Sequence, residues 1–450
     1  MNEVFQYIDQ HADLYVERLR LLCQQPSVAA QDYGVAECAE MVKTMLDGLG
    51  AATQLLPTGG PPVVYGELAG RGDRTLSFYD HYDVQPPEPL ELWDSEPLGA
   101  AVRDGRIYAR GVADNKGDLV ARLCAVEAYQ AVRGPLPVRL KFIVEGEEEV
   151  GSPHLEAFAD AHPDLIAADA NIWEGSLIDL NGRVEAWLGV KGMAYVELSV
   201  TCAKSDLHSM MATIVPNAVW RLAWALNTLK GPDERIRVPG FYDAVRPPTE
   251  QERQALAEVN FNAEAHRELF GLDQFLLGLE GLSLLEKHIF QPTMNIAGIW
   301  GGYTGPGLKT VLPNAAACKI DMRLVPDQVP EEVVAAIRRH LDRQGFGDVQ
   351  VKLLAAERSA RTPLDAPIVQ TVHRAVERVY GHPPVLYPMV PGTGPMYPLC
   401  QKHNIPSVSV GGVITTDCNV HAPNENVAIV NYLNGIKLAA QIVEEFGAAP

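Results

Sequence analysis

The stretch DLVARLCAVEAYQAVRGPLPVRLKFIV, residues 118–144, decides the fold class of this 450-residue chain. Apolar residues recur at helical spacing from about Asp118 to Val132, and an apolar run follows from Val138 to Val144. A helix that leads directly into a buried strand is typical of alternating α/β units, in which neighbouring strands run parallel. The stretch therefore predicts an α/β domain with a central, mostly parallel sheet flanked by helices.

The sequence on both sides of this stretch continues the alternation of helices and strands. Further helices are expected at 4–22, 35–49, 366–380 and 426–446, and further strands at Pro62–Tyr65 and Thr75–Tyr79. The α/β pattern therefore occupies both ends of the chain.

Between these two parts the character of the sequence changes. Val190–Thr201 predicts one long strand, a helix is expected at Asn217–Leu229, and 249–270 is a polar segment with helical spacing. A block that interrupts a pattern which later resumes indicates an inserted domain. We expect the chain to divide into a first domain made of 1–188 and 356–450 and an inserted α+β domain, 189–355.

Composition and charge exclude several classes of protein. The chain has 37 basic and 57 acidic residues, a net charge of −20, whereas binding to nucleic acid or to anionic lipid needs a basic face. Its seven cysteines form no CxxC pair, which favours reduced thiols, and the N-terminus lacks the pattern of a signal peptide. The longest uncharged stretch, Val379–Gln401, holds six prolines and cannot be a membrane helix. We expect a soluble cytoplasmic protein with no nucleic-acid or membrane partner.

Two polar clusters flank the predicted elements. In FYDHYDVQP, residues 78–86, His81 offers an imidazole to a metal ion and Asp83 could orient that ring. In RGVADNKGD, residues 110–118, Asp114 could bridge two ions, because a carboxylate has two oxygens. Taken alone, the first cluster is better explained by a polar surface loop, and a helix N-cap partly explains the second.

A third cluster, EGEEEVGS at residues 145–152, holds four carboxylates within five residues. Carboxylates this close repel one another unless cations neutralise them. A solvated acidic loop is the usual explanation of such a run. Here the run follows a buried strand and ends in a Gly-Ser turn, which favours a metal site.

Three further candidates are Glu174 in DANIWEG, His208 in SDLHS and His421 in NVHAPNE. A single histidine is more often a surface or core residue than a metal ligand. Two histidines combined with several carboxylates, each in a turn marked by Gly or Asp, form the ligand set of a zinc or manganese pair.

In this order the motifs resemble the M20 family of dinuclear metallopeptidases over nearly the whole chain. LWDSEP, residues 92–97, and RDGRIYARG, residues 103–111, are most similar to its carnosinase-like and Cys-Gly dipeptidase branch. The resemblance implies metal-dependent hydrolysis of an amide bond in a dipeptide or short peptide with a free C-terminal carboxylate. The alternative substrate is an N-acyl amino acid. A binding protein without catalysis would be expected to have lost a ligand or the base, and all candidates are present.

The resemblance also implies a role for each candidate residue. Two divalent ions per subunit are expected, zinc first and manganese or cobalt as alternatives. One ion would be bound by His81 and Glu174, the other by Glu149 and His421, and Asp114 would bridge both.

The remaining roles are in proton transfer and in substrate binding. Glu148 would be the general base, Asp83 would support His81, and His208 would reach the other subunit of a homodimer to polarise the scissile carbonyl. The inserted domain would then be a dimerisation or lid domain. The substrate carboxylate would be held by Arg323, Gly392, Thr393 and Gly394.

Three positions depart from the family pattern, at Asp80, at Met210-Met211-Ala212 and in the turn Pro391–Pro395. We expect all three to lie around the substrate, where they would affect specificity and leave the metal chemistry intact.

Overall fold

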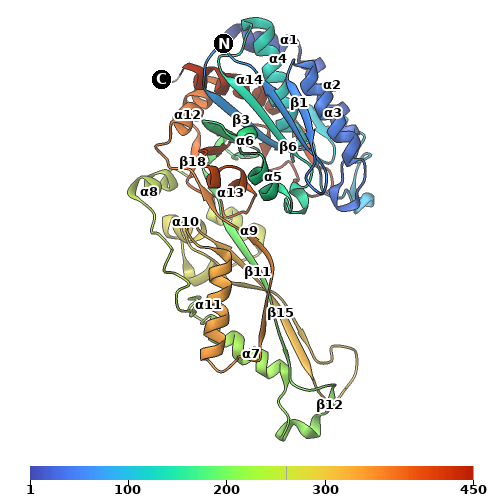
Figure 1. Cartoon of the computed structure of the whole chain (residues 1–450), viewed down its shortest axis with the longest axis vertical. Coiled ribbons are helices and arrows are strands. Elements are labelled where there is room, and N and C mark those ends of the chain that lie inside the picture. Colours follow the sequence, from blue (N-terminus) through green and yellow to red (C-terminus); the bar gives the residue numbers. More distant parts are fainter. Residues whose placement is uncertain (260, 449–450) are drawn as a thin grey trace.

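The computed structural model describes residues 1–259 and 261–448, and it divides into a larger and a smaller lobe (Figure 1). An eight-stranded sheet in the order β1-β2-β6-β3-β7-β19-β9-β18 forms the centre of the larger lobe. Its neighbouring central strands run parallel, and they are β6 (Arg139–Glu145), β3 (Thr75–His81), β7 (Ala170–Trp173) and β19 (Ser407–Ser409). The predicted α/β fold with a mainly parallel sheet is confirmed.

The outer strands complete this sheet. On one side β2 (Val63–Leu68) and β1 (Ala52–Leu56) add antiparallel strands. On the other side β9 (Glu185–Trp187) is antiparallel to β19, and β18 (Val385–Tyr387) runs parallel to β9. The sheet therefore joins strands from both ends of the chain.

Helices cover both faces of the large sheet, so its strands are buried on both sides. Phe78 packs into the core under one set of helices, and the next residue, Tyr79, packs into the core under the other. The first set is α1 (Asn2–Gln10), α2 (Ala12–Gln24), α3 (Val35–Gly48), α4 (Lys116–Arg133), α12 (Pro367–Tyr380) and α14 (Ile429–Ala448). The second set is α5 (Leu155–Ala161), α6 (Pro163–Ile166) and α13 (Met396–Leu399).

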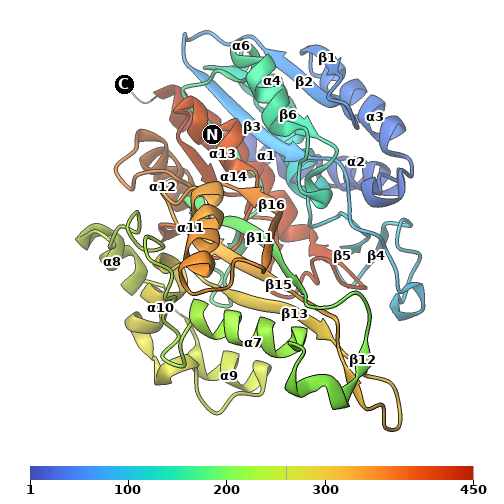
Figure 2. The same cartoon turned by 60° about the horizontal axis from the view of Figure 1, so that its bottom comes forward.

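The smaller lobe is built on a four-stranded antiparallel sheet that α7 and α11 cover on one face (Figure 2). The strands, in sheet order, are β13 (Asn295–Gly301), β15 (Ala315–Leu324), β11 (Gly192–Thr201) and β16 (Gln350–Glu357). Residues alternate between buried and half-buried along β11, so its apolar side chains face α7 (Ala218–Leu229) and α11 (Pro330–Arg343). This sheet draws all of its strands from the stretch between Gly192 and Glu357.

The remaining elements are short. The helices are α8 (Glu250–Ala257), α9 (Ala263–Phe270) and α10 (Gly281–Phe290), and β4 (Ala101–Arg103), β5 (Arg106–Tyr108) and β21 (Asn426–Ala428) form a small sheet. The paired two-residue strands are β8 (Leu177–Ile178) with β20 (Ile414–Thr415), β10 (Gly189–Val190) with β17 (Ala360–Arg361), and β12 (Leu207–His208) with β14 (Val311–Leu312). None of the helices in 1–259 and 261–448 is long and apolar enough to cross a membrane.

Three predicted helices are wrong in extent. The helix expected at 4–22 is two helices that meet at His11, whose φ of −106° departs from helical geometry. The segment 249–270 also holds two helices, since the side chain of Asn262 caps a new helix, α9, by accepting from Ala265 N. The helix expected at 426–446 begins only at Ile429, because 426–428 pair with β5 as a strand.

Candidate metal centre

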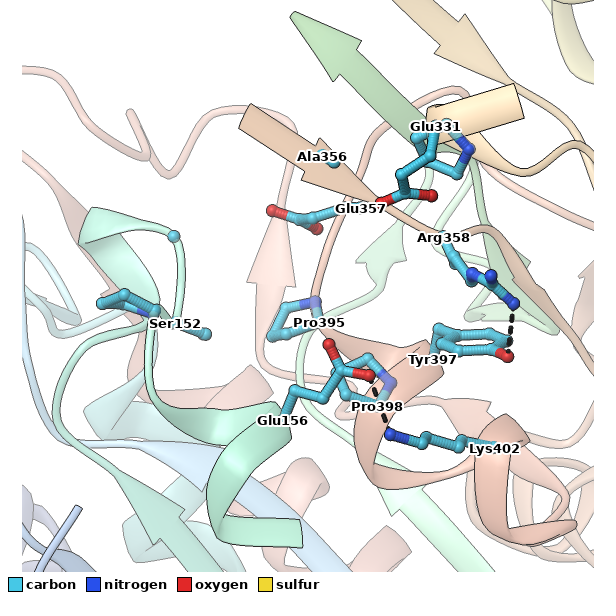
Figure 3. Close-up of a pocket in the computed structure, with 13 residues that line it drawn as sticks. Ser152, Glu156, Glu331, Ala356, Glu357, Arg358, Pro395, Tyr397, Pro398 and Lys402 are labelled. Atoms are coloured by element: carbon cyan, nitrogen blue, oxygen red, sulfur yellow. Dashed lines mark hydrogen bonds and ion pairs between the residues drawn. The ribbon is translucent and has the colours of Figure 1, made fainter. Parts of the chain in front are cut away.

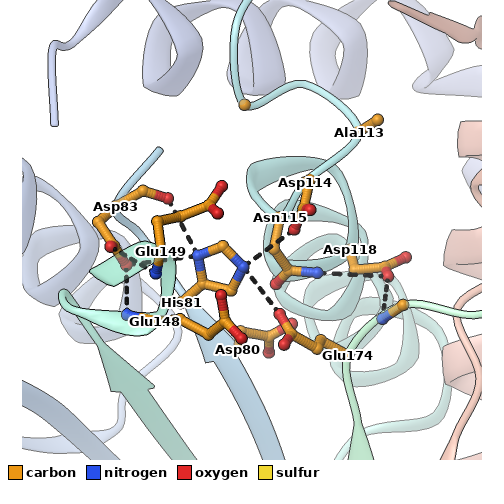
Figure 4. A network of polar contacts seen from close by, with 12 residues as sticks. Asp80, His81, Asp83, Ala113, Asp114, Asn115, Asp118, Glu148, Glu149 and Glu174 are labelled. Carbon is orange, nitrogen blue, oxygen red and sulfur yellow. Dashed lines mark hydrogen bonds and ion pairs between the residues drawn. The ribbon is translucent and has the colours of Figure 1, made fainter. Parts of the chain in front are cut away.

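Three adjacent parallel strands carry the predicted ligands to one edge of the large sheet (Figure 4). His81 is the last residue of β3, Glu174 follows β7 directly, and Glu148 and Glu149 lie in the turn after β6. His81 pairs in register with Glu145, the last residue of β6. Because the carboxyl ends of parallel strands meet at the same edge, the local sequence at each strand end is enough to bring these side chains together.

The side chains form two groups of possible metal ligands that share Asp114. In the first group His81 Nε2 lies 3.0 Å from Asp114 Oδ1 and 2.9 Å from Glu174 Oε2. In the second group His421 Nε2 lies 3.1 Å from Asp114 Oδ2 and 3.0 Å from Glu149 Oε2. Asp114 therefore turns one oxygen toward each histidine, as a carboxylate that bridges two cations must.

The donor set of the two groups fits a pair of divalent ions. With metal–ligand bonds of roughly 2.0–2.2 Å, two ligand atoms of a tetrahedral site lie about 3.3 Å apart, close to the separations here. Glu149 Oε1 is buried and accepts no hydrogen bond from the described residues, which leaves a lone pair free for a cation. Imidazole nitrogens with carboxylate oxygens suit zinc or manganese.

The carboxyl groups of the site also favour bound cations. Burial raises the pKa of the Glu174 carboxyl group, and burial together with the nearby Glu174 carboxylate raises the pKa of Glu148 well above its usual range. Hydrogen bonds to Asp114 and Glu149 raise the pKa of His421 to about 10. Protonated imidazoles thus supply positive charge to these carboxylates, and bound metal ions would supply it more strongly.

Glu148 lies beside the ligand groups and belongs to neither of them (Figure 4). The backbone N–H groups of Glu148 and Glu149 each donate to the Asp83 carboxylate at 3.1 Å. Asp83 Oδ1 also lies 3.4 Å from His81 Nδ1. Asp83 therefore connects the turn that holds Glu148 to the back of the His81 ring.

Glu425 holds the Asp114 turn in place, and the sequence reasoning missed it. Its carboxylate accepts hydrogen bonds from the backbone N–H groups of Ala113 and Asp114 at 2.9 and 3.1 Å, and from Arg110 Nη1 at 2.6 Å. Glu425 ends the same motif that contains His421, so it joins two of the three segments that supply the second ligand group. The sequence feature that could have identified Glu425 is its position at the end of the motif NVHAPNE.

Asp80 does not lie against the substrate, and that expectation is wrong. Its side chain is fully buried and pairs with Arg122 Nη1 of α4 at 2.8 Å. Arg122 also donates to the backbone oxygens of Tyr79 and Trp173 at 2.6 and 2.7 Å. The pair therefore fastens the ends of β3 and β7 to α4 behind the ligands, since a carboxylate can be buried when a guanidinium accompanies it.

Two of the predicted substrate-binding elements come together, and His208 remains apart from them. Arg323 Nη1 donates to Thr393 Oγ1 at 2.6 Å, and Gly392 O accepts from Lys191 N at 2.8 Å. His208 is exposed in β12, which lies at the end of the smaller lobe that points away from the large sheet (Figure 1). Within one chain, His208 is therefore not part of the site.

A cavity of about 460 Å³ adjoins the metal-binding turn (Figure 3). It lies between Ser152 on one side and Glu357 and Arg358 at the end of β16 on the other, with Pro395 after Gly394 in its wall. Among its charged groups, Lys402 pairs with Glu156 at 2.8 Å and Arg358 donates to Tyr397 Oη at 3.1 Å. The turn that carries Glu148 is thus separated from the small sheet by open space.

Comparison with known proteins identifies similar sequences. Residues 77–445 match the family described as Peptidase family M20/M25/M40. The chain is 30% identical to human Beta-Ala-His dipeptidase over 98% of this chain and 91% of that protein. It is 28% identical to the Cys-Gly metallodipeptidase dug1 of Schizosaccharomyces pombe over 100% of this chain and 98% of that protein.

Solved structures are similar over the whole length. The M20 family metallo-carboxypeptidase Sso-CP2 from Sulfolobus solfataricus has 36% identity and a TM-score of 0.89 over 97% of this chain and 99% of that chain. Human carnosine dipeptidase 1 has 28% identity and a TM-score of 0.79 over 100% of this chain and 99% of that chain. These solved structures therefore share the fold of this chain over nearly its whole length.

Proposed function

The chain belongs to the M20/M25/M40 family of peptidases, and from this premise we propose that it hydrolyses dipeptides or short peptides with a free C-terminal carboxylate. The observation that carries the proposal is the pair of ligand groups that share Asp114, with Glu148 beside them and outside both. The proposed ligands are His81 and Glu174 for one ion and Glu149 and His421 for the other. With two ions bound, this arrangement would place a base that is free to accept a proton next to a pair of Lewis acids.

The proposed mechanism divides the work between the ions and the protein. When bound, two divalent ions polarise the scissile carbonyl and lower the pKa of a water molecule. Glu148 accepts a proton from the water that attacks the carbonyl carbon and delivers it to the leaving amine nitrogen as the C–N bond breaks. Asp83 keeps His81 oriented, because its backbone oxygen accepts a hydrogen bond from Nδ1 at 3.0 Å and its carboxylate lies 3.4 Å from the same nitrogen.

Removal of the metal tests this proposal. The protein dialysed against a strong chelator should lose its hydrolysis of a dipeptide such as Ala-Gly, and zinc, manganese or cobalt should restore it. Elemental analysis should find two ions per chain, since six ligand positions in two groups are available. An N-acyl amino acid panel, assayed in parallel, distinguishes the deacylase alternative. Full activity of the metal-free protein would contradict the proposal.

We also propose that Arg323 binds the substrate carboxylate together with the turn of Gly392, Thr393 and Gly394. Arg323 carries a guanidinium fork, and its hydrogen bond to Thr393 fixes one edge of that fork. The names of similar proteins agree with this role, because they are dipeptidases and a carboxypeptidase.

Amidation of the substrate tests the role of Arg323. A dipeptide with a C-terminal amide should be hydrolysed with a kcat/KM about 100-fold lower than the free acid, because the guanidinium would face a neutral group. Arg323→Met should remove most of this difference, whereas Arg339→Met, at an exposed position on α11, should preserve it. Equal rates on the acid and the amide would count against the role.

We further propose that residues 189–355 form an inserted dimerisation domain through which two chains pair. Trp220 and Trp224 on α7 are 60% and 55% exposed, and Ile299 on the edge strand β13 is 56% exposed. An edge strand with large exposed apolar side chains needs a covering partner, and a second copy would supply one. In such a homodimer His208 of one chain would polarise the substrate carbonyl in the other.

We propose the cytoplasm as the location of the protein. All seven cysteines are free thiols in the structure. Free thiols are typical of proteins in a reducing compartment.

A further inference from the structure

A second cavity, of about 370 Å³, is lined by Arg323 near the end of β15. One part of its wall comes from the connection between α9 and α10 and from α10 itself, and another from Pro391, just before the Gly392 turn. Thr293 also lines it and accepts a hydrogen bond from Arg323 N at 3.0 Å. The cavity is therefore continuous with the proposed carboxylate site.

Basic groups line this cavity and no acidic side chain among the described residues does. The cationic residues are Lys191, Lys287 and Arg323. His288 also lines the cavity, but burial and the neighbouring Lys191 lower the pKa of its ring and favour the neutral form. Asp321 lies 3.5 Å from Arg323 Nε, outside the lining, and balances only part of this charge. The cavity thus favours an anionic group in its occupant.

Lys191 strengthens this preference because its charge is buried. Its side chain is 1% exposed, and Nζ donates to the backbone oxygens of His288 and Gln291, both at 2.7 Å. Burial and the neighbouring Arg323 lower the pKa of Lys191 to about 8. A carboxylate placed near both groups would relieve their repulsion, and one N–H of the ammonium is still free to donate to it.

Another part of the cavity lining is apolar. It consists of Phe275, Leu276, Leu279 and Leu284. Leu276 is 56% exposed, so part of this apolar wall faces water in the structure described. An apolar group of a ligand that covered the wall would bury this surface favourably.

We propose that this cavity receives the C-terminal residue of the substrate and selects a large apolar side chain there. The carboxylate would lie at Arg323 and Lys191, and the side chain would pack against Phe275, Leu279 and Leu284. This inference rests on the proposed function. It applies equally to peptides and N-acyl amino acids, because both present the same carboxyl-terminal amino acid to the site.

A series of substrates that differ only in the last residue tests the selection. In the zinc-loaded protein, kcat/KM for Ala-Leu and Ala-Phe should exceed that for Ala-Gly by about 10- to 100-fold, as expected for burial of a large apolar side chain. Ala-Asp should fall below Ala-Leu, since a second carboxylate would meet the apolar wall. Equal rates across the series, or a preference for Ala-Asp, would overturn the proposal.

Variants of the wall identify the cavity as the source of the selection. Leu279→Ala and Leu284→Ala should each lower the ratio of Ala-Leu to Ala-Gly about threefold to tenfold. Leu282→Ala is the matched control, because Leu282 lies on the same helix as Leu284, is 39% exposed and does not line the cavity. If both wall variants keep the ratio of the original protein, the cavity does not select the side chain.

A binding measurement separates this inference from the proposed function. Free leucine, measured by calorimetry, should bind at least about 10-fold more tightly than free glycine, and Leu279→Ala should remove the difference. This readout requires no hydrolysis. Tighter leucine binding without turnover would leave the cavity assignment standing and contradict the proposed function, whereas turnover with equal binding of both amino acids would contradict the cavity assignment alone.

Discussion

Glu148→Gln should lower kcat on a dipeptide by about 10²- to 10⁴-fold while the protein still binds two metal ions. The amide keeps the size of the side chain and loses the ability to accept a proton. The backbone N–H of Glu148, which donates to Asp83 at 3.1 Å, is unchanged by the substitution, so the turn should keep its position. Steady-state kinetics and elemental analysis of the same preparation measure both effects.

The neighbouring variant Glu149→Gln is the matched control. Glu149 belongs to the second ligand group with Asp114 and His421, so its variant should lose part or all of one ion. The other glutamate of this run, Glu147, pairs with His154 Nδ1 at 2.7 Å and lies in neither group. Full metal content in Glu149→Gln together with loss of metal in Glu148→Gln would reverse the proposed roles.

The parts of the site that lie at strand ends could be predicted from the sequence. The expected helix Asp118–Val132 is found as α4, Lys116–Arg133, and the expected strand Val138–Val144 as β6, Arg139–Glu145. Both are long enough for periodicity to identify them. Once β6, β3 and β7 are parallel neighbours, the polar residue after each strand must reach the same edge.

Several strands could not be predicted from the sequence, because they are too short for periodicity to identify them. β7, β19, β9 and β18 have three or four residues each, which is at most two full alternations of an apolar pattern. Their position in the sheet depends on pairing with distant partners, as β19 pairs with β7 across more than two hundred residues. Local propensity carries no information about such pairing.

Contacts between residues that are distant in sequence explain why the roles of Glu425 and Asp80 were not predicted. Glu425 accepts from Arg110, and Asp80 pairs with Arg122, so each partnership forms only after the chain has folded. A buried charge is recognisable in sequence only when its partner is also known. In the sequence, Asp80 could be identified as a departure from the family pattern. Its role became clear from the structure, in which it pairs with the guanidinium group of Arg122 on α4.

Mixing two nearly inactive variants should restore activity if His208 acts on the partner's site. His208→Ala removes a group proposed to polarise the carbonyl, and loss of one such donor commonly costs about 10²- to 10³-fold in kcat. Glu148→Ala removes the base. After the two chains are unfolded and refolded together, each heterodimer contains one site with an intact Glu148 and the other chain's intact His208.

Random pairing of equal amounts makes half of the dimers heterodimers, each with one complete site, so about a quarter of the original activity should return. The exposure of His208 on β12, away from its own metal ligands, is the structural reason to expect this result (Figure 1). Glu148→Ala mixed with Glu149→Gln is the control, because both residues serve the site of their own chain and no complete site can form. If the His208→Ala mixture is as inactive as this control while mass spectrometry detects heterodimers, His208 does not act across the interface.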